Sequence, residues 1–470
     1  MSGLHLYSDF PPDIDQSTSE SPFPFEKLSG VKARDLAATM SSLIRSGEIA
    51  AGNRLPPVRT VANALELSTG SVAAAWLKLR ADGLVKTHRR GGTIVSPLTA
   101  ATSKTAADTF TERDPSTIVD LAHGMTDPDL ENEMEAALIS GLRSPNLHSP
   151  YREFITKKLR EAVEPTWPFE PEEWTTLGGG AESTVLALEA AAPRGSSVAI
   201  EQPTSPRLLD MLSELGLRPI AVACDKDGPI PEGLIQALDR KPAAFIFRPR
   251  AQVPLGISVG PARIKQLADV LAAHSSSAWI IEDDNNGPIS MADVHSIGRY
   301  LPERVLHIRS FCKTYGIDLR TSVLGGPRQL VERMRKLRSH GYGMTSRICQ
   351  DALAYLLTSR EASRLVDESR FRYARLRQMM ADVLRSFGID CMGADGSLLW
   401  VKVPDEAKAI VNLAMLGITV GPGARCYVNP PEEQHIRIAT SRLPEDKHHI
   451  HKLGEAIAQA ITGMPPEEFD

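Results

Sequence analysis

The chain has 470 residues, of which 42% are hydrophobic and 24% are charged, and this composition indicates a folded protein of roughly two to four domains. No apolar run approaches the ~18 residues that a membrane-spanning helix needs, and the N-terminus lacks the basic-then-apolar pattern of a signal peptide. The five cysteines are scattered without a CxxC pair, which argues against a disulfide framework and a zinc site. We therefore expect a cytoplasmic protein with no membrane association and no bound metal.

The net charge of −5 is distributed unevenly along the chain. Residues 31–97 hold ten basic and four acidic side chains, a net charge of +6, so the remaining residues together carry −11. Positive charge gathered in one module is what binding to the phosphates of DNA requires. The alternative, on charge alone, is a solvated charged face without a nucleic-acid role.

Composition and periodicity divide the chain into four segments. Residues 1–25 are rich in Asp, Ser and Pro and lack apolar periodicity, so we expect a disordered tail. A basic module is predicted at 26–97, and the small polar residues 98–117 are expected to form a linker. The body is predicted at 118–465, and its last part, from about residue 350, is expected to be a smaller α+β subdomain.

The basic module has the pattern of three helices followed by two strands. Apolar spacing predicts a first helix at 32–46, and Pro57 suits the first turn of a second helix. Ser68 is a suitable N-cap for the third helix. Two short strands, 84–87 and 93–95, flank a basic tip and are expected to form a hairpin. This order predicts a winged helix-turn-helix, whose third helix enters the major groove of DNA.

Three linked segments of this module, 55–59, 67–72 and 89–95, resemble the GntR family of transcription regulators. The pair Thr69-Gly70 is smaller than the residues usual at the start of the third helix, which favours backbone contacts and DNA shape over direct base readout. The resemblance implies that double-stranded DNA is contacted by the second helix, the third helix and the wing, through Arg59, Ser68, Thr69, Ser71, Arg89, Arg90 and Gly91.

In the body, short apolar runs alternate with amphipathic helices, and each run has the length of a buried strand. Such alternation predicts an α/β fold with a mostly parallel sheet and helices on both of its faces. The five runs are 197–200, 219–223, 244–247, 278–281 and 305–308.

Four features of the body point to pyridoxal 5'-phosphate (PLP). Lys313 follows a predicted strand among small or hydroxyl residues, so it can form a Schiff base. The acidic run 282–284 ends another strand, and a carboxylate there can keep the pyridine nitrogen protonated. The Gly-rich segment 178–183 lies between a strand and a helix, so its backbone amides can bind phosphate. Arg320 supplies a guanidinium for the same phosphate.

Together and in this order, these motifs resemble fold-type I aminotransferases over residues 118–465. The whole chain resembles the MocR subfamily, in which a GntR-type winged helix is fused to an aminotransferase-like domain. The resemblance implies PLP as cofactor, with Lys313 as the Schiff-base lysine and Asp283 at the pyridine nitrogen. It also implies that Gln252 approaches the ring hydroxyl and that Arg437 binds an incoming carboxylate. The implied phosphate ligands are Gly180, Ala181, Ser310 and Arg320.

The sequence departs from the aminotransferase pattern around the predicted ring. Asn285 stands where a tyrosine usually bonds the ring hydroxyl, and Ser205 stands where an aromatic residue usually stacks on the ring. Cys312 replaces a serine that often binds phosphate. Asn285 is nevertheless predicted to contact the cofactor, because it takes the position of that tyrosine. Arg207 and Arg425 lie in loops near the predicted site, where each either contacts an effector or is an ordinary surface cation; we assign Arg207 to the effector.

We therefore predict a DNA-binding transcription regulator that senses an amino compound by exchanging Lys313 for the ligand amine. A homodimer is expected, because fold-type I sites lie at a subunit interface and a two-fold dimer suits paired DNA half-sites. A second interpretation is an active PLP-dependent aminotransferase that carries a DNA-binding module. A third is a regulator whose cofactor site has degenerated at Ser205 and Asn285, so that the body only dimerises or binds another ligand.

Overall fold

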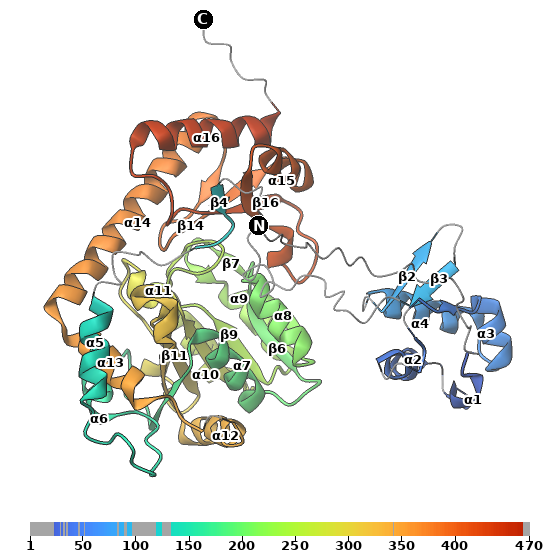
Figure 1. Cartoon of the computed structure of the whole chain (residues 1–470), viewed down its shortest axis with the longest axis horizontal. Helices are drawn as coiled ribbons and strands as arrows, with labels where there is room; N and C mark the ends of the chain where they lie inside the picture. The colour runs from blue at the N-terminus through green and yellow to red at the C-terminus, as the bar shows by residue number, and fades with distance from the viewer. Residues whose placement is uncertain are drawn as a thin grey trace, which may run out of the picture. The chain divides into compact units, whose positions relative to one another are not determined.

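A computed structural model of the chain describes residues 23–95, 119–124 and 133–463, with breaks at 29, 32, 34–35, 46–47, 51, 82–83, 89–91 and 342. The chain divides into two compact units, Met1–Thr109 and Phe110–Asp470 (Figure 1). Among the described residues, no helix combines the length and the apolar composition needed to cross a membrane.

The first unit packs short helices against a small antiparallel sheet. Strands β2 and β3 form the predicted wing, and β1, which the sequence did not predict, pairs with the other edge of β3. The Ser71 amide donates to Ser68 Oγ at 3.0 Å, which confirms Ser68 as a cap of the third predicted helix. The elements are α1 (Phe25–Leu28), α2 (Leu36–Arg45), β1 (Arg54–Leu55), α3 (Val58–Ala64), α4 (Thr69–Ala81), β2 (Val85–His88) and β3 (Gly92–Val95).

The second unit is built on an eight-stranded sheet, and all five predicted apolar runs lie in its strands or overlap them. The five central strands, β7, β6, β9, β10 and β11, are parallel, whereas β12, β5 and β8 run antiparallel to their neighbours. The carboxyl ends of the parallel strands therefore meet at one edge, where ligands bind in sheets of this kind. In spatial order the strands are β5 (Glu173–Leu177), β12 (Ser322–Gly326), β11 (Val305–Ser310), β10 (Trp279–Asp284), β9 (Ala244–Phe247), β6 (Ser197–Gln202), β7 (Arg218–Asp225) and β8 (Gly228–Pro229).

Helices cover both faces of this sheet, as predicted, because alternate strand residues point to opposite sides. Ile246 of β9 packs with residues of α7, α8 and α12 on one face, whereas Phe245 and Phe247 pack with residues of α9 and α10 on the other. The helices of this layer are α5 (Met134–Leu142), α6 (Lys157–Val163), α7 (Gly180–Ala191), α8 (Pro206–Glu214), α9 (Pro231–Asp239), α10 (Pro261–Ala273), α11 (Cys312–Tyr315), α12 (Arg328–Arg338) and α13 (Arg347–Thr358).

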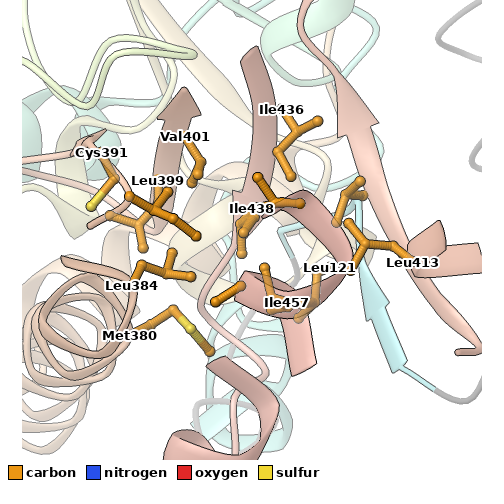
Figure 2. Packing of buried hydrophobic residues seen from close by; sticks show 14 of the residues in the cluster. Leu121, Met380, Leu384, Cys391, Leu399, Val401, Leu413, Ile436, Ile438 and Ile457 are labelled. Carbon is orange, nitrogen blue, oxygen red and sulfur yellow. The ribbon is translucent and has the colours of Figure 1, made fainter. Parts of the chain in front are cut away.

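The C-terminal part of the second unit forms a smaller α+β layer with its own five-stranded sheet, in the order β13-β14-β16-β15-β4. The edge strand β4 comes from the start of this unit, some 300 residues earlier, and Leu121 of β4 packs among Leu413, Ile438 and Ile457 (Figure 2). The elements are β4 (Val119–Leu121), α14 (Arg360–Ser386), β13 (Cys391–Met392), β14 (Leu398–Val403), α15 (Glu406–Met415), β15 (Ile418–Pro422), β16 (Gln434–Ala439) and α16 (Lys447–Thr462).

Candidate cofactor and effector site

Lys313 lies in α11, the short helix that follows the carboxyl end of β11. Its Nζ atom donates a hydrogen bond to Oδ1 of Asn286 at 2.7 Å. Dense packing around the amine lowers the pKa of Lys313 to about 8, and the Arg248 guanidinium adds to this effect, although solvent still reaches part of the side chain. A lysine of lowered pKa is partly neutral near physiological pH, which makes it a nucleophile toward aldehydes.

Asp283 is fully buried near the carboxyl end of β10 and interacts electrostatically with Lys313. Its Oδ2 atom accepts a hydrogen bond from Arg248 Nη2 at 2.9 Å, whereas its Oδ1 atom has no partner among the described residues. Burial raises the pKa of Asp283, and the Arg248 guanidinium opposes that rise. An unpartnered buried oxygen costs about 1–3 kcal/mol, so Asp283 Oδ1 is a natural acceptor for a donor on a bound ligand.

A backbone cradle lies at the N-terminus of α7. Gly179, with φ of 108°, precedes the helix, which opens with Gly180 and Ala181. A Cβ atom on Gly180 would lie 1.7 Å from Oδ1 of Asn285, and one on Gly179 would lie 3.1 Å from Cys312 Sγ. A larger residue at 180 would therefore displace the Asn285 side chain. The first-turn amides, which have no acceptor within the helix, are available to an anion.

The other predicted phosphate ligands, Ser310 and Arg320, differ in their exposure. Ser310 is buried at the end of β11, and Arg320 follows in a left-handed turn with φ of 43° and an exposed side chain. The Arg320 charge lowers the pKa of Arg207, second to burial, so the two guanidinium groups lie near each other. The Gly178 amide is already bonded to Glu182 Oε2 at 2.5 Å, which leaves the following amides for phosphate.

Gln252 and Asn285, the two residues predicted to contact the ring hydroxyl, differ in their hydrogen bonding. Gln252 is buried, and both of its polar groups are used: Nε2 donates to the Pro203 carbonyl at 2.7 Å, and Oε1 accepts the Leu255 amide at 2.9 Å. Asn285 Oδ1, by contrast, is buried and has no partner within the described part of the chain. Asn285 is thus better placed than Gln252 to offer a polar atom to a ligand.

Arg437 projects from β16 and is half-buried. Its Nη2 atom donates to the Ala122 carbonyl at 3.2 Å, and its Nε atom has no hydrogen-bond partner among the residues that the structure describes. Arg437 and Arg207 both lower the pKa of Lys313, behind burial and Arg248, so the three guanidinium groups converge on the lysine. A site with this excess of positive charge suits a ligand that carries a phosphate and a carboxylate.

Together these features fit PLP. Lys313 offers a nucleophilic amine, Asp283 offers an unpartnered acceptor for the pyridine nitrogen, and the N-terminus of α7 offers amides for the phosphate. Asn285 supplies a further unpartnered oxygen at the same place. Except for Lys313 and Arg320, whose side chains are exposed, the predicted cofactor residues are buried or half-buried at the carboxyl edge of the sheet or at the start of α7.

Of the predicted DNA contacts, Arg59 lies on α3, Thr69 and Ser71 lie on α4, and Ser68 directly precedes α4. Arg59, Ser68 and Thr69 are exposed, as an interface requires. Ser68 and Ser71 bond to each other through their hydroxyl groups at 2.8 Å, so part of their capacity is used in capping α4. The predicted wing contacts, Arg89, Arg90 and Gly91, lie outside the described residues.

Three residues of the site were missed by the sequence analysis: Arg248, Glu201 and Asn286. Arg248 Nη1 lies 3.7 Å from Glu201 Oε1, and the Arg248 amide donates to Glu201 Oε2 at 3.1 Å. Both residues directly follow apolar runs that were recognised as strands, and Asn286 follows the acidic run that ends another. Their place at the carboxyl ends of parallel strands was the signal that could have identified them.

Comparison with known proteins supports both halves of the chain. A model of the family "Aminotransferase class I and II" matches residues 128–450, and a model of "Bacterial regulatory proteins, gntR family" matches residues 32–95. The chain is 28% identical to the vitamin B6 salvage pathway transcriptional repressor PtsJ of Salmonella typhimurium, over 93% of this chain and 100% of that protein. It is 25% identical to the HTH-type pyridoxine biosynthesis transcriptional regulator PdxR of Corynebacterium glutamicum, over 82% of this chain and 86% of that protein.

Solved structures of aminotransferases share the fold of the second unit. The multiple substrate aminotransferase of Thermococcus profundus superposes with a TM-score of 0.69 at 16% identity, over 78% of this chain and 96% of that chain. A mutant aspartate aminotransferase of Thermus thermophilus gives a TM-score of 0.63 at 20% identity, over 75% and 98% of the two chains. At this level of identity the likeness establishes the fold alone.

Proposed function

Because this chain belongs to the aminotransferase class I and II family and carries a gntR-family module ahead of it, as MocR regulators do, we propose that it is a transcription regulator whose body senses a small amino compound through PLP. Similarity to transcription regulators extends over 93% of the chain, and therefore includes the body as well as the DNA-binding module. Control of transcription from a cytoplasmic location follows from this proposal.

One observation carries the cofactor assignment: a lysine of lowered pKa and an unpartnered buried carboxylate oxygen lie beside a glycine-rich helix N-terminus. When bound, PLP supplies an aldehyde that combines reversibly with amines. Lys313 would hold the cofactor covalently, Asp283 would accept a hydrogen bond from the ring nitrogen, and Gly180 and Ala181 would donate to the phosphate. An amino compound would then compete with Lys313 for the aldehyde.

Arg437 offers a route from ligand to linker. Its guanidinium bonds the Ala122 carbonyl, and Ala122 directly follows β4, the first described strand after the predicted linker. A ligand carboxylate that binds Arg437 would compete with this carbonyl. A ligand that binds one arrangement of the 119–124 segment more tightly than another would shift the population between them, which is what a regulatory signal requires.

A vitamin B6 compound is a second candidate effector. The curated relatives PtsJ and PdxR are named for vitamin B6 salvage and pyridoxine biosynthesis, and the excess of arginines around Lys313 suits a phosphorylated ligand. In this case PLP would itself be the signal, and Lys313 would report its concentration. Operator binding measured with PLP alone, and with PLP plus a panel of amino acids, separates the two candidates.

The site favours regulation over turnover. The ring would lack the stacking aromatic residue that Ser205 replaces, and a lost aromatic contact costs about 0.5–1.5 kcal/mol beyond the area buried. Asn285 in place of a tyrosine would remove a phenolic hydrogen bond, worth about 0.5–1.5 kcal/mol. A covalent bond and phosphate contacts can retain PLP despite these losses. Transamination would be indicated by steady conversion of an amino donor and a 2-oxo acid.

The decisive experiment is the visible absorbance spectrum of the purified protein after addition of PLP, compared with Lys313→Ala. The proposal expects a yellow lysine-bound form in the wild type only. Absence of a band from both proteins would leave the body as a dimerisation or alternative-ligand domain. A homodimer is part of the proposal, and a monomer in gel filtration at micromolar concentration would remove it.

A further inference from the structure

Arg248 connects two buried acids next to the proposed cofactor. It follows β9, and its guanidinium donates to Asp283 Oδ2 at 2.9 Å while its Nη1 lies 3.7 Å from Glu201 Oε1. All three side chains are at most about one-tenth exposed. Arg248 therefore occupies one oxygen of Asp283 and leaves the other oxygen without a partner among the described residues.

Resting on the proposed function, we propose that Arg248 is a positioning residue: it keeps Asp283 ionised and fixes its orientation, so that the free oxygen accepts the proton of the cofactor's ring nitrogen. The proton shared between that nitrogen and Asp283 can reside on either the ring nitrogen or the carboxylate. If it moved to Asp283, the carboxylate would lose its charge and Arg248 would lose its partner. Arg248 thus holds the proton on the ring.

The distances explain why Arg248 favours a proton on the ring nitrogen rather than on Asp283. The guanidinium touches the carboxylate at hydrogen-bonding distance, whereas a ring nitrogen on the far oxygen lies beyond the carboxylate. Because Coulomb energy falls with distance, the attraction to the Asp283 charge exceeds the repulsion of a ring proton. Burial on its own raises the pKa of Asp283, so without Arg248 this carboxylate would tend to take up the proton.

Glu201 does not compete strongly for Arg248 at neutral pH. Burial raises the pKa of Glu201 to about 8, so this side chain is mostly protonated below that pH. Its contact with Arg248 Nη1, at 3.7 Å, is also longer than a hydrogen bond. Arg248 therefore has one charged partner, Asp283, and its single positive charge is directed there.

The test is the ¹⁵N chemical shift of ring-labelled PLP bound to the wild type, Arg248→Gln and Arg248→Lys at pH 7, with Kd for PLP measured on the same proteins. In Arg248→Gln the shift is expected to move toward that of an unprotonated ring, and Kd is expected to rise about ten- to a hundredfold. Arg248→Lys keeps the charge and should restore most of the wild-type shift. An Arg248→Gln protein that binds PLP with the wild-type shift would overturn the inference.

Arg250→Gln is the matched control. Arg250 is also buried and also bonds an aspartate of β10, Asp284, but that aspartate is on the opposite face of the strand. Its loss should lower thermal stability and leave the ¹⁵N shift unchanged; an equal shift in both variants would assign the Arg248 effect to general disruption and overturn the inference. Failure of the wild type itself to bind PLP would instead overturn the proposed function. If Arg248→Gln does not fold, the ¹⁵N shift of Arg248→Lys carries the test: a small move toward the unprotonated ring is expected, and a shift identical to that of the wild type together with an unchanged Kd would overturn the inference.

Discussion

The two faces of strand β10 carry adjacent acids with opposite properties. On one face Glu282 bonds His307 Nδ1 at 2.8 Å and the Ile297 amide at 2.7 Å, and Asp284 bonds Arg250 at 2.7 and 3.2 Å. On the other face Asp283 keeps one oxygen without a partner within the described part of the chain. Three acids of one strand are thus equally buried but differ in their bonding. The oxygens of Glu282 and Asp284 have partners that stabilise the fold, whereas the unpartnered oxygen of Asp283 is the one that we propose for the ligand.

Neutralising each aspartate would test this contrast most directly. Arg250 and His307 outweigh burial and lower the pKa of Asp284, whereas burial raises the pKa of Asp283. The folded state thus favours charge on Asp284 and disfavours it on Asp283. Asp284→Asn is expected to cost about 3–5 kcal/mol of unfolding free energy. Asp283→Asn should cost less, because it removes the partner of Arg248 but also removes a buried charge that the fold disfavours. Urea denaturation without PLP measures both, and equal losses would contradict the contrast.

Glu201 predicts a pH dependence of the free energy of unfolding. Its pKa of about 8 in the folded protein lies above the ordinary value of 4.5, so between these values the folded state holds a proton that the unfolded state lacks. This contribution to stability therefore falls as pH rises from about 5 to 8, by up to about 1.4 kcal/mol per pH unit. Stability curves of Glu201→Gln should lack this slope. Parallel curves for variant and wild type would show that Glu201 titrates normally.

The rate at which the protein binds PLP should depend on the protonation state of the Lys313 amine. Its pKa is lowered to about 8, so the neutral amine, and with it the rate at which the visible band appears, should rise through pH 8 rather than through 10.5. Below pH 8 the expected dependence is about tenfold per pH unit. Stopped-flow absorbance between pH 6 and 10 measures it. A rate still increasing tenfold per unit at pH 10 would indicate an ordinary lysine.

Arg437→Lys should have the smallest effect and should be selective. Lysine keeps the positive charge but loses the planar pair of donors, so a carboxylate effector should bind roughly tenfold more weakly while PLP affinity changes little. Titration of operator DNA binding with amino acids and with the matching decarboxylated amines would distinguish these cases. An equal loss for both kinds of ligand would exclude a carboxylate contact.

Much of this architecture could be predicted because it depends on local patterns. The five buried strands of the body and the cap at Ser68 follow from apolar runs and from side-chain chemistry next to a helix. Strands β1 and β4 could not be predicted in this way, because two or three residues paired with distant segments leave no periodicity. The same limit applies to Arg248: its role depends on Asp283, which is 35 positions away and is brought beside it only by the parallel sheet.

The pairing of β4 also has a consequence for synthesis on the ribosome. Val119–Leu121 pairs with Ile418–Val420, so about 300 more residues must be synthesised before the partner strand of β4 exists. The winged helix, whose contacts are all close in sequence, can fold long before then. A nascent chain would thus have a formed winged helix while Val119–Leu121 still lacks its partner strand. Control by ligand becomes available only when the chain is nearly complete.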